Sequence, residues 1–318
     1  MPDDNGKYTY YPGCAAKGSS AAYEMSMLAV GEVLGMNFEE IDDWNCCGAT
    51  EYFSINAIPA YSLVARNLAL AEQMESDQLV ASCSACFLNL NKTNKYMGKH
   101  PDLDQKVNRA LAAGGLSYDG GLTVRHLLDV VVSDVDQELI AQKVTQPLSG
   151  LRVAPYYGCM VVRPDETFDN QEYPMTLDHL MATLGATVVD FPLKAHCCGG
   201  HMTQISEDVA FELIRRLLHN AAEYEADVIV TLCPMCQLNL DAYQNNVNRR
   251  FGTDYNLPVL YFTQLMGLAF GLDAKELGIG TEIVSANKAL AKIGQVEEAP
   301  RKKPARRDKK ALPMPGEM

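Results

Sequence analysis

The chain has 318 residues, of which 47% are hydrophobic and 21% charged, a composition typical of a globular protein with room for two domains. Its net charge of −13 at neutral pH argues against nucleic acid as the main ligand. The chain does not open on a basic stretch followed by an apolar one, and no apolar run reaches the roughly 20 residues of a membrane-spanning helix, so we expect a cytoplasmic protein without a transmembrane segment.

The first half of the chain alternates strand and helix patterns. The stretch "KYTYYP" at residues 7–12 is short, aromatic and followed by glycine, which predicts a strand. Residues 21–35 and 59–74 place apolar side chains at spacings near 3.6, which predicts two helices. The stretch "DQLVASC" at residues 77–83 is the continuous apolar run of a buried parallel strand, and a helix is expected after it.

The second half repeats this alternation. Strands are expected in "LRVAPYY", "ATVVDFP" and "DVIVTLC", and helices over residues 175–185 and 208–225. The apolar stretch over residues 257–272 is interpreted as a buried strand and helix. Strands that alternate with helices predict the α/β class, with one sheet in each half.

Ten cysteines follow one spacing pattern that occurs twice. The pattern is C-x31-CC-x35-C-x2-C in the first half and C-x37-CC-x34-C-x2-C in the second. The flanking residues repeat as well, since "YYPGC" answers "PYYGC" and "CSACFLNLN" answers "CPMCQLNLD". We therefore predict an internal duplication, with two similar halves over residues 1–147 and 148–290 related by a pseudo-two-fold arrangement.

A basic segment follows the second half. Residues 299–318 hold seven lysines or arginines and two acidic residues, so they carry +5 and the remainder of the chain carries −18. Because this stretch has almost no apolar residues, we expect the whole of 291–318 to be a disordered tail. It is interpreted as a solvated tail, as a docking arm for an acidic partner or, less favoured, as a nucleic-acid patch.

The cysteines fall where the predicted strands end. In open α/β sheets the carboxyl ends of parallel strands meet at one edge, so the cysteines of each half are expected to converge there. A helix that begins after Cys83 or Cys233 would favour thiolate over thiol, which is the form a metal binds. A glycine follows each cysteine pair, at Gly48 and Gly199, and would let the backbone approach a bulky ligand.

Several kinds of cysteine site are compatible with some of these residues. A structural zinc site wants four ligands, whereas each half offers five, and a thioredoxin-like dithiol would leave three cysteines of each half unused. An iron-sulfur cluster uses several thiolates from distant parts of a sequence and fits best. The C-x2-C-x2-C-x3-C-P run of ferredoxins is absent from the sequence, so ordinary ferredoxin clusters are not expected.

The doubled cysteine pattern, with "YYPGC" and "DWNCCGAT", resembles the CCG domain of the heterodisulfide reductase B subunit from residue 7 to about residue 280. This resemblance implies two noncubane 4Fe-4S clusters, each bound by all five cysteines of one half. The expected ligands of cluster 1 are Cys14, Cys46, Cys47, Cys83 and Cys86. The expected ligands of cluster 2 are Cys159, Cys197, Cys198, Cys233 and Cys236.

The resemblance also implies a function, that of a catalytic iron-sulfur subunit that reduces or forms a disulfide between two thiols. His196 and His201 flank the second cysteine pair and are candidate proton donors, or they only orient the site. The first half has Asn45 and Thr50 near its pair instead.

No flavin, nicotinamide or ferredoxin motif occurs in the sequence, so electrons must come from elsewhere. The resemblance implies two partners, the ferredoxin-like C subunit and the flavin-carrying A subunit of such a complex, which is cytoplasmic or part of a larger, membrane-associated assembly. It also implies a small thiol or disulfide as substrate.

A different function remains open from the sequence. Related CCG-domain subunits pass electrons to quinone in complexes that oxidise hydroxyacids or succinate, so this chain is alternatively an electron-transfer subunit. A structural scaffold is a third interpretation. Two complete sets of cysteines favour the catalytic function without deciding between these alternatives.

Overall fold

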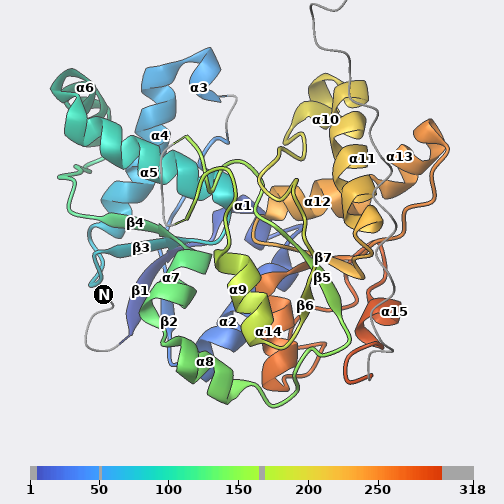
Figure 1. Cartoon of the computed structure of the whole chain (residues 1–318). Coiled ribbons are helices and arrows are strands. Elements are labelled where there is room, and N and C mark those ends of the chain that lie inside the picture. The colour runs from blue at the N-terminus through green and yellow to red at the C-terminus, as the bar shows by residue number, and fades with distance from the viewer. Residues whose placement is uncertain (1–5, 50–51, 165–168, 296–318) are drawn as a thin grey trace, which may run out of the picture.

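The computed structural model describes residues 6–49, 52–164 and 169–295. It contains two four-stranded sheets, with strand orders β2-β1-β3-β4 and β6-β5-β7-β8 (Figure 1). Every strand pair in both sheets is parallel. Since the same order of strands occurs twice along the chain, the α/β fold with two similar halves that the sequence predicts is confirmed.

The strands follow one another in the same order in the two halves, and within the described ranges the first half has one more helix, α1, after its first strand. The first half consists of β1 (Lys7–Tyr11), α1 (Gly13–Ala16), α2 (Ala21–Leu34), β2 (Asn37–Glu40), α3 (Tyr52–Ile55), α4 (Ala57–Ala71), β3 (Gln78–Ala81), α5 (Ser84–Lys99), α6 (Pro101–Ala112), β4 (Thr123–His126), α7 (Leu127–Asp134) and α8 (Gln137–Lys143). The second half consists of β5 (Arg152–Tyr156), α9 (Thr176–Thr183), β6 (Thr187–Val188), α10 (Met202–Ile205), α11 (Glu207–Glu223), β7 (Val228–Thr231), α12 (Pro234–Ala242), α13 (Gln244–Phe251), β8 (Val259–Tyr261), α14 (Phe262–Phe270) and α15 (Asn287–Leu290).

Of the two central strands in each sheet, β3 and β7 are buried along their whole length. All residues of β3 and β7 are buried, which explains why their sequences are continuous apolar runs rather than alternating ones. Strand β2 lies at a sheet edge, and its residues alternate between exposed and half-buried. Its sequence, "NFEE", has too few apolar residues to indicate a strand, so only the pairing with β1 reveals it.

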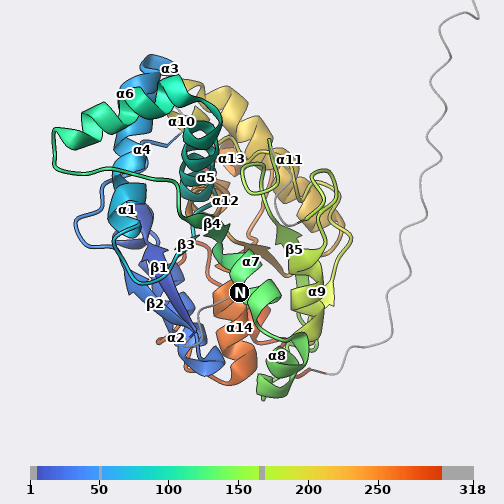
Figure 2. The ribbon, with the colours of Figure 1, turned by 90° about the vertical axis from the view of Figure 1, so that its left-hand side faces the viewer.

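The two halves pack against each other through equivalent helices. Helix α2 of the first half packs on α14 of the second, while α9 of the second half packs on α7 of the first (Figure 2). Helices α2 and α9 follow the first strands of their sheets, and α7 and α14 follow the last, so the contacts are reciprocal. Reciprocal contacts of this kind are what a pseudo-two-fold arrangement of halves produces.

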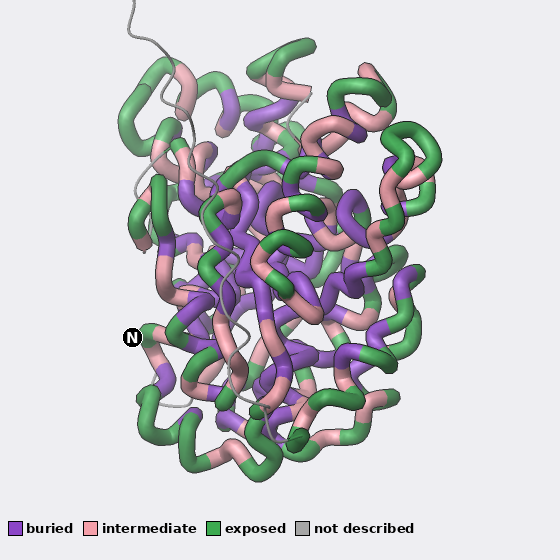
Figure 3. Tube along the Cα trace, turned by 45° about the vertical axis from the view of Figure 1, so that its right-hand side comes forward, coloured by how far each residue is buried: buried purple, intermediate pink, exposed green. Residues whose placement is uncertain are grey.

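Buried residues gather in the middle of the molecule, whereas the outer turns and helix ends are exposed (Figure 3).

The first residues of the predicted tail are held by contacts with the second half. Gly294 donates its N–H to the carbonyl of Ser149, and Lys292 pairs with Asp227, so residues 291–295 are not part of a disordered segment. The rest of that prediction, residues 296–318, lies outside the described residues. The boundary between residues 147 and 148 remains a prediction.

Within the described ranges, no helix combines the length and the apolar character that crossing a bilayer requires.

Candidate functional site

The C-x-x-C cysteines lie at the carboxyl ends of the central strands, where the sequence predicts them. Cys83 comes two residues after β3 and is the N-cap of α5, and Cys233 comes two residues after β7 and is the N-cap of α12. Cys14 lies in α1 directly after β1, and Cys159 follows β5 in the same way. Two segments of each half, one after each central strand, therefore bring their cysteines to one edge of one sheet.

The thiols of each half form close pairs. In the first half, the Sγ atoms of Cys46 and Cys14 are 3.7 Å apart, and those of Cys47 and Cys86 are 3.4 Å apart. In the second half, the Sγ atoms of the equivalent residues Cys198 and Cys236 are 3.6 Å apart. Cys159 and Cys197 complete the correspondence, since their thiols also interact.

The two cysteine sets meet at the interface between the halves. The thiol of Cys83 interacts with that of Cys233, although 150 residues separate them in the sequence. The hydroxyl of Tyr23, on α2, donates to the carbonyl of Leu232 at 3.2 Å and so fastens the first half to the residue before Cys233. The first cysteine of each C-x-x-C is therefore the point of contact between the two sets.

One side of each set is open to solvent. Cys14, Cys46 and Cys197 are exposed and Cys159 is half-buried, while the other cysteines are buried. His201 of the second half lies close enough to Cys46 of the first for its charge to lower the pKa of that thiol. The opening of the first set is therefore lined in part by the second half.

The exposed cysteine of each adjacent pair has a lowered pKa. A hydrogen bond from Cys14 is the main cause that lowers the pKa of Cys46, to about 2. A hydrogen bond from Cys159 likewise lowers the pKa of Cys197 to about 6. Thiolates are the form that binds iron or zinc, so these two positions are prepared for a metal.

Two glycines leave the space that a cysteine sulfur of each set occupies. A Cβ atom at Gly13 or at Gly158 would lie 2.9 Å from the Sγ of Cys86 or Cys236, respectively, closer than such atoms approach. Both glycines also have left-handed backbones, with φ values of 72° and 70°. The glycine before the first cysteine of each set is therefore needed for the set to close around a bulky ligand.

The donors suit an iron-sulfur cluster. Among the residues with described positions, no group of three or more His, Cys, Asp or Glu side chains is arranged to hold one metal ion. Each half offers five soft sulfur ligands, the donor type that iron-sulfur clusters use.

A repeated tyrosine fastens each cysteine pair. The hydroxyl of Tyr11 donates to the carbonyl of Asn45 at 2.8 Å, and that of Tyr156 donates to the carbonyl of His196 at 2.7 Å. Asn45 and His196 are the residues directly before the adjacent cysteines. The repeat of tyrosine in "YYPGC" and "PYYGC" thus has a structural reason, because each tyrosine hydrogen-bonds the residue directly before one cysteine pair.

The proposed proton donors differ in their position. His196 is exposed and lies directly before Cys197, and its carbonyl is held by Tyr156. His201 is half-buried and acts on Cys46 of the other half, a relation that sequence proximity to the second pair did not indicate. Thr50 lies outside the described residues.

A buried ion pair supports the second set alone. Lys194 is 1% exposed, and its Nζ lies 2.6 Å from Oδ1 of Asp178. The other carboxylate oxygen accepts the hydroxyl of Tyr157, and the carbonyl of Lys194 accepts the N–H groups of Tyr157 and Gly158. This network connects the segment before Cys159 to the segment before Cys197. The only sequence signal for it is a lysine within the otherwise apolar stretch "FPLKA".

A buried histidine, His126, was also missed from the sequence. It ends β4 with a completely buried side chain, and its Nδ1 accepts the N–H of Leu128 at 3.1 Å. Its ring also interacts with the backbone of Ser82 and Leu232, the residues that precede Cys83 and Cys233. A single side chain of the first half therefore contacts the residues that directly precede both C-x-x-C motifs.

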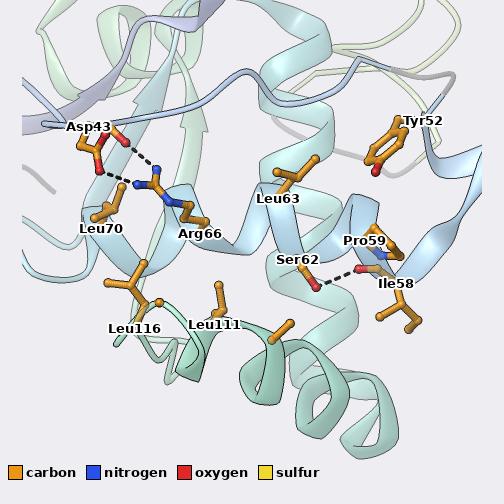
Figure 4. A pocket seen from close by; sticks show the side chains of 12 residues that line it. Asp43, Tyr52, Ile58, Pro59, Ser62, Leu63, Arg66, Leu70, Leu111 and Leu116 are labelled. Carbon is orange, nitrogen blue, oxygen red and sulfur yellow. Dashed lines mark hydrogen bonds and ion pairs between the residues drawn. The ribbon is translucent and has the colours of Figure 1, made fainter.

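A surface groove of about 650 Å³ lies between α4 and α6, and Asp43, three residues before Cys46, is among the residues that line it (Figure 4). At one side of the groove, Arg66 of α4 donates to the carbonyl and carboxylate of Asp43 and to the side chain of Asn45. These bonds hold the segment that leads to Cys46 against α4.

Known proteins resemble this chain along most of its length. It is 35% identical to the 8-methylmenaquinol:fumarate reductase membrane anchor subunit of Wolinella succinogenes, over 89% of this chain and 98% of that protein. It is 31% identical to the B subunit of the ferredoxin:CoB-CoM heterodisulfide reductase of Methanosarcina mazei, over 91% of this chain and 98% of that protein. The crystal structure of a hypothetical protein from Helicobacter pylori matches with a TM-score of 0.70 and 15% identity, over 90% of this chain and 53% of that chain, which shows a shared fold.

The cysteine-rich domain of the CCG family matches the chain twice, over residues 8–91 and 153–241. Each match contains one complete set of five cysteines. Relatives named as heterodisulfide reductase subunits belong to an oxidoreductase family, and together with the cysteine-rich domain they imply iron-sulfur clusters. The chain therefore belongs to the CCG cysteine-rich domain family that includes the B subunits of heterodisulfide reductases.

Proposed function

We propose that this chain is the catalytic iron-sulfur subunit of a heterodisulfide reductase-like complex and that it reduces, or forms, a disulfide between two thiols. The observation that carries this proposal is the contact between Cys83 and Cys233, through which two complete cysteine sets adjoin. Cleavage of a disulfide consumes two electrons and two protons and releases two thiols. Two adjacent one-electron centres can supply both electrons without releasing a free thiyl radical.

Each cysteine set is proposed to hold one noncubane 4Fe-4S cluster, which supplies one-electron redox chemistry when bound. The ligands would be the five cysteines of each half. The exposed thiols Cys14, Cys46 and Cys197 lie on the open sides of the sets, where a small substrate can arrive. The buried cysteines face the interface and the protein interior.

Protons must reach the departing thiolates, and His196 and His201 are the proposed donors. His201 is the better placed, because it lies near Cys46, an exposed cysteine of the other set. In a His201→Ala variant with full iron content we expect a loss of turnover of roughly 10²-fold or more, the usual contribution of a general acid. The exposed His219 on α11 provides a matched control, His219→Ala, and an unchanged rate in His201→Ala would assign His201 a structural role.

The chain is proposed to work as one part of a larger complex and to have no flavin or nicotinamide of its own. Its electron donors would be the ferredoxin-like C subunit and the flavin-carrying A subunit of that complex. Relatives named as subunits of heterodisulfide reductases support this. A cytoplasmic location, alone or within a membrane-associated complex, is proposed on the same grounds.

The first experiment is to measure iron, labile sulfide and the EPR spectrum of anaerobically purified chain, and then to add candidate thiols under oxidising conditions. Two 4Fe-4S clusters correspond to about eight irons per chain. A new paramagnetic signal that responds to one thiol would support disulfide chemistry. Full iron content without a response to any thiol would contradict it, and zinc in place of iron would contradict the cofactor as well.

A second candidate function is electron transfer from an oxidising subunit towards quinone. The specific observation in its favour is the 35% identity to a protein named as a membrane anchor subunit of an 8-methylmenaquinol:fumarate reductase, a name that links that protein to a quinone, there as the reduced electron donor. To separate the two functions, the dithionite-reduced chain would be offered a short-chain menaquinone analogue or a disulfide. Rapid oxidation by the quinone alone would favour electron transfer, whereas oxidation by the disulfide with release of two thiols would favour the catalytic function.

A further inference from the structure

An asparagine of the first half, Asn89, lies behind the first cysteine pair. It is on α5, three residues after Cys86, and it is 3% exposed. Residues three apart on a helix share a face, so Asn89 points to the same side as Cys86. Its side-chain amide donates to the carbonyl of Cys47 at 3.2 Å and to the carbonyl of Ala49.

The second half contains the same arrangement around Asn239. This residue is on α12, three residues after Cys236, and it is also 3% exposed. Its side-chain amide donates to the carbonyl of Cys198 at 3.2 Å and to the carbonyl of Gly200 at 2.8 Å. The two asparagines are the central residues of the Leu-Asn-Leu stretches that repeat after each C-x-x-C.

The turn after each cysteine pair explains why such a donor is needed. Gly48 and Ala49 have φ values of 74° and 49°, and Gly199 and Gly200 have φ values of 97° and 51°. Two successive left-handed residues form a turn in each half, and an asparagine amide is the donor for a carbonyl on either side of it, those of Cys47 and Ala49 in the first half and of Cys198 and Gly200 in the second. A left-handed conformation is also unfavourable for an alanine, so the first turn persists only if its surroundings hold it.

We propose that Asn89 and Asn239 are positioning residues for the adjacent cysteines. Each asparagine closes the left-handed turn after one pair and thereby directs both neighbouring thiols into the same set. Because the asparagine and the second C-x-x-C cysteine share a helix face, one helix holds the last cysteine and the pair in register. This inference rests on the proposed iron-sulfur clusters, and it does not depend on which substrate they act upon.

The two positions differ in one contact. The amide of Asn239 also lies 3.5 Å from the Sγ of Cys198 and donates to it. Hydrogen bonds to ligand sulfurs stabilise the reduced, more negative state of a cluster and so raise its reduction potential. Asn239 is therefore inferred to tune the potential of the second cluster as well as to position its ligands.

The test compares Asn89→Leu and Asn239→Leu, which keep the side-chain size and remove the donors, in the full chain purified without oxygen. Asn94 and Asn248 provide matched controls, because they donate to the loop carbonyls of Leu122 and Tyr255, away from the cysteines. We expect each test variant to fall from about eight irons to about four. Asn94→Leu and Asn248→Leu are expected to retain full iron content.

A second measurement distinguishes tuning from simple support. In the fraction of Asn239→Leu chains that keeps the second cluster, an EPR redox titration should show a lower midpoint potential for that cluster. The potential of the first cluster in Asn89→Leu should equal that of the wild type. An asparagine with a structural role alone would lower the fraction of chains that hold the cluster and leave the midpoint potentials of both clusters unchanged.

Full iron content in both test variants, or equal iron loss in the controls, would overturn the inference. If the leucine variants do not fold, Asn89→Asp and Asn239→Asp preserve the side-chain shape while replacing the donor, and the same iron loss is expected. A wild-type chain with about eight irons but no response to thiols would contradict the disulfide function and leave this inference standing. A wild-type chain without iron would overturn both.

Discussion

At the scale of single residues, the glycines before Cys14 and Cys159 are the positions least able to accept a side chain. In Gly13→Ala and Gly158→Ala the new methyl group would collide with the buried Sγ of Cys86 or Cys236, and a positive φ adds strain. We expect each variant to lose about half of the roughly eight irons, because only its own set fails to close. Iron and labile sulfide content per chain provide the measurement.

The matched control for these variants is Gly98→Ala in α5. A Cβ there meets no atom within 4 Å, and the residue is exposed on a helix. The added methyl group should raise the free energy of unfolding by about 0.5–1 kcal/mol with no change in iron content. Full iron content in Gly158→Ala would contradict the conclusion that the second set needs a glycine at this position.

The buried pair Lys194–Asp178 is also a matter of single residues. In Lys194→Met a carboxylate that is 6% exposed loses its cation, which should lower the free energy of unfolding by about 3–5 kcal/mol. The double variant Lys194→Met/Asp178→Leu removes both charges and should lose less than the single variant. Equilibrium unfolding in urea provides the measurement.

The exposed pair Lys7–Glu75 is the control for that prediction. Its two side chains are 35% and 75% exposed, so Lys7→Met should leave the free energy of unfolding nearly unchanged. A double variant at Lys194 and Asp178 that is as unstable as the single variant would show that packing, rather than the unpaired charge, dominates at this site.

At the scale of elements, α2 and α14 form the main contact between the halves. Tyr23 of α2 stacks on Tyr261 at the start of α14, with ring centroids 4.2 Å apart and planes 2° from parallel. Beside them, the hydroxyls of Ser26 and Thr263 lie 2.6 Å apart in a buried position. Because Ser26 donates to the carbonyl of Tyr23, Thr263 is the donor between the two hydroxyls.

The Ser26–Thr263 contact makes a double-mutant cycle informative. Ser26→Ala leaves the Thr263 hydroxyl buried without an acceptor, and we expect a loss of about 1–3 kcal/mol in the free energy of unfolding. Ser26→Ala/Thr263→Val removes both polar groups and should recover most of that loss. Strictly additive effects of the two substitutions in urea unfolding would show that the contact contributes no coupling between the halves.

At the scale of the whole molecule, His126 lies where the two halves and the two cysteine sets come together. Burial lowers the pKa of His126 to about 4, whereas an unfolded histidine has a pKa near about 6.5. Between these values the unfolded chain binds a proton that the folded chain excludes, so folding becomes less favourable as the pH falls. Above a pH of about 6.5 the histidine is neutral in both states, and its contribution is fully present.

From this linkage we expect the free energy of unfolding to fall by about 2 kcal/mol between roughly pH 7.5 and pH 5 through His126 alone. In His126→Asn the amide oxygen can still accept the N–H of Leu128, and the titrating group is gone, so this part of the pH dependence should vanish. The exposed residue His179 provides a control substitution, His179→Asn. Identical pH profiles for wild type and His126→Asn would contradict the prediction.

Much of the fold was predictable because its signals are local. The buried strands β3 and β7 and the amphipathic helices α2, α4 and α11 have the periodicities that their surroundings require. Strand β2 was not predictable, since a polar edge strand is defined by its pairing partner rather than by its own residues. The tail prediction extended too far towards the body, because composition does not register the contact between Gly294 and Ser149.

The sequence by itself determined the two cysteine sets, their division between two similar α/β halves and the family, because spacing and repetition are properties of the chain alone. Only the tertiary structure decided that Cys83 adjoins Cys233 and that His201 lies near Cys46 of the other half. It also decided that His126 contacts the residues before both C-x-x-C motifs. The physical reason is that these relations depend on how α2 packs on α14 and α9 on α7. That packing is set by side chains far apart in the sequence, such as Ser26 and Thr263, whose partnership no local pattern records.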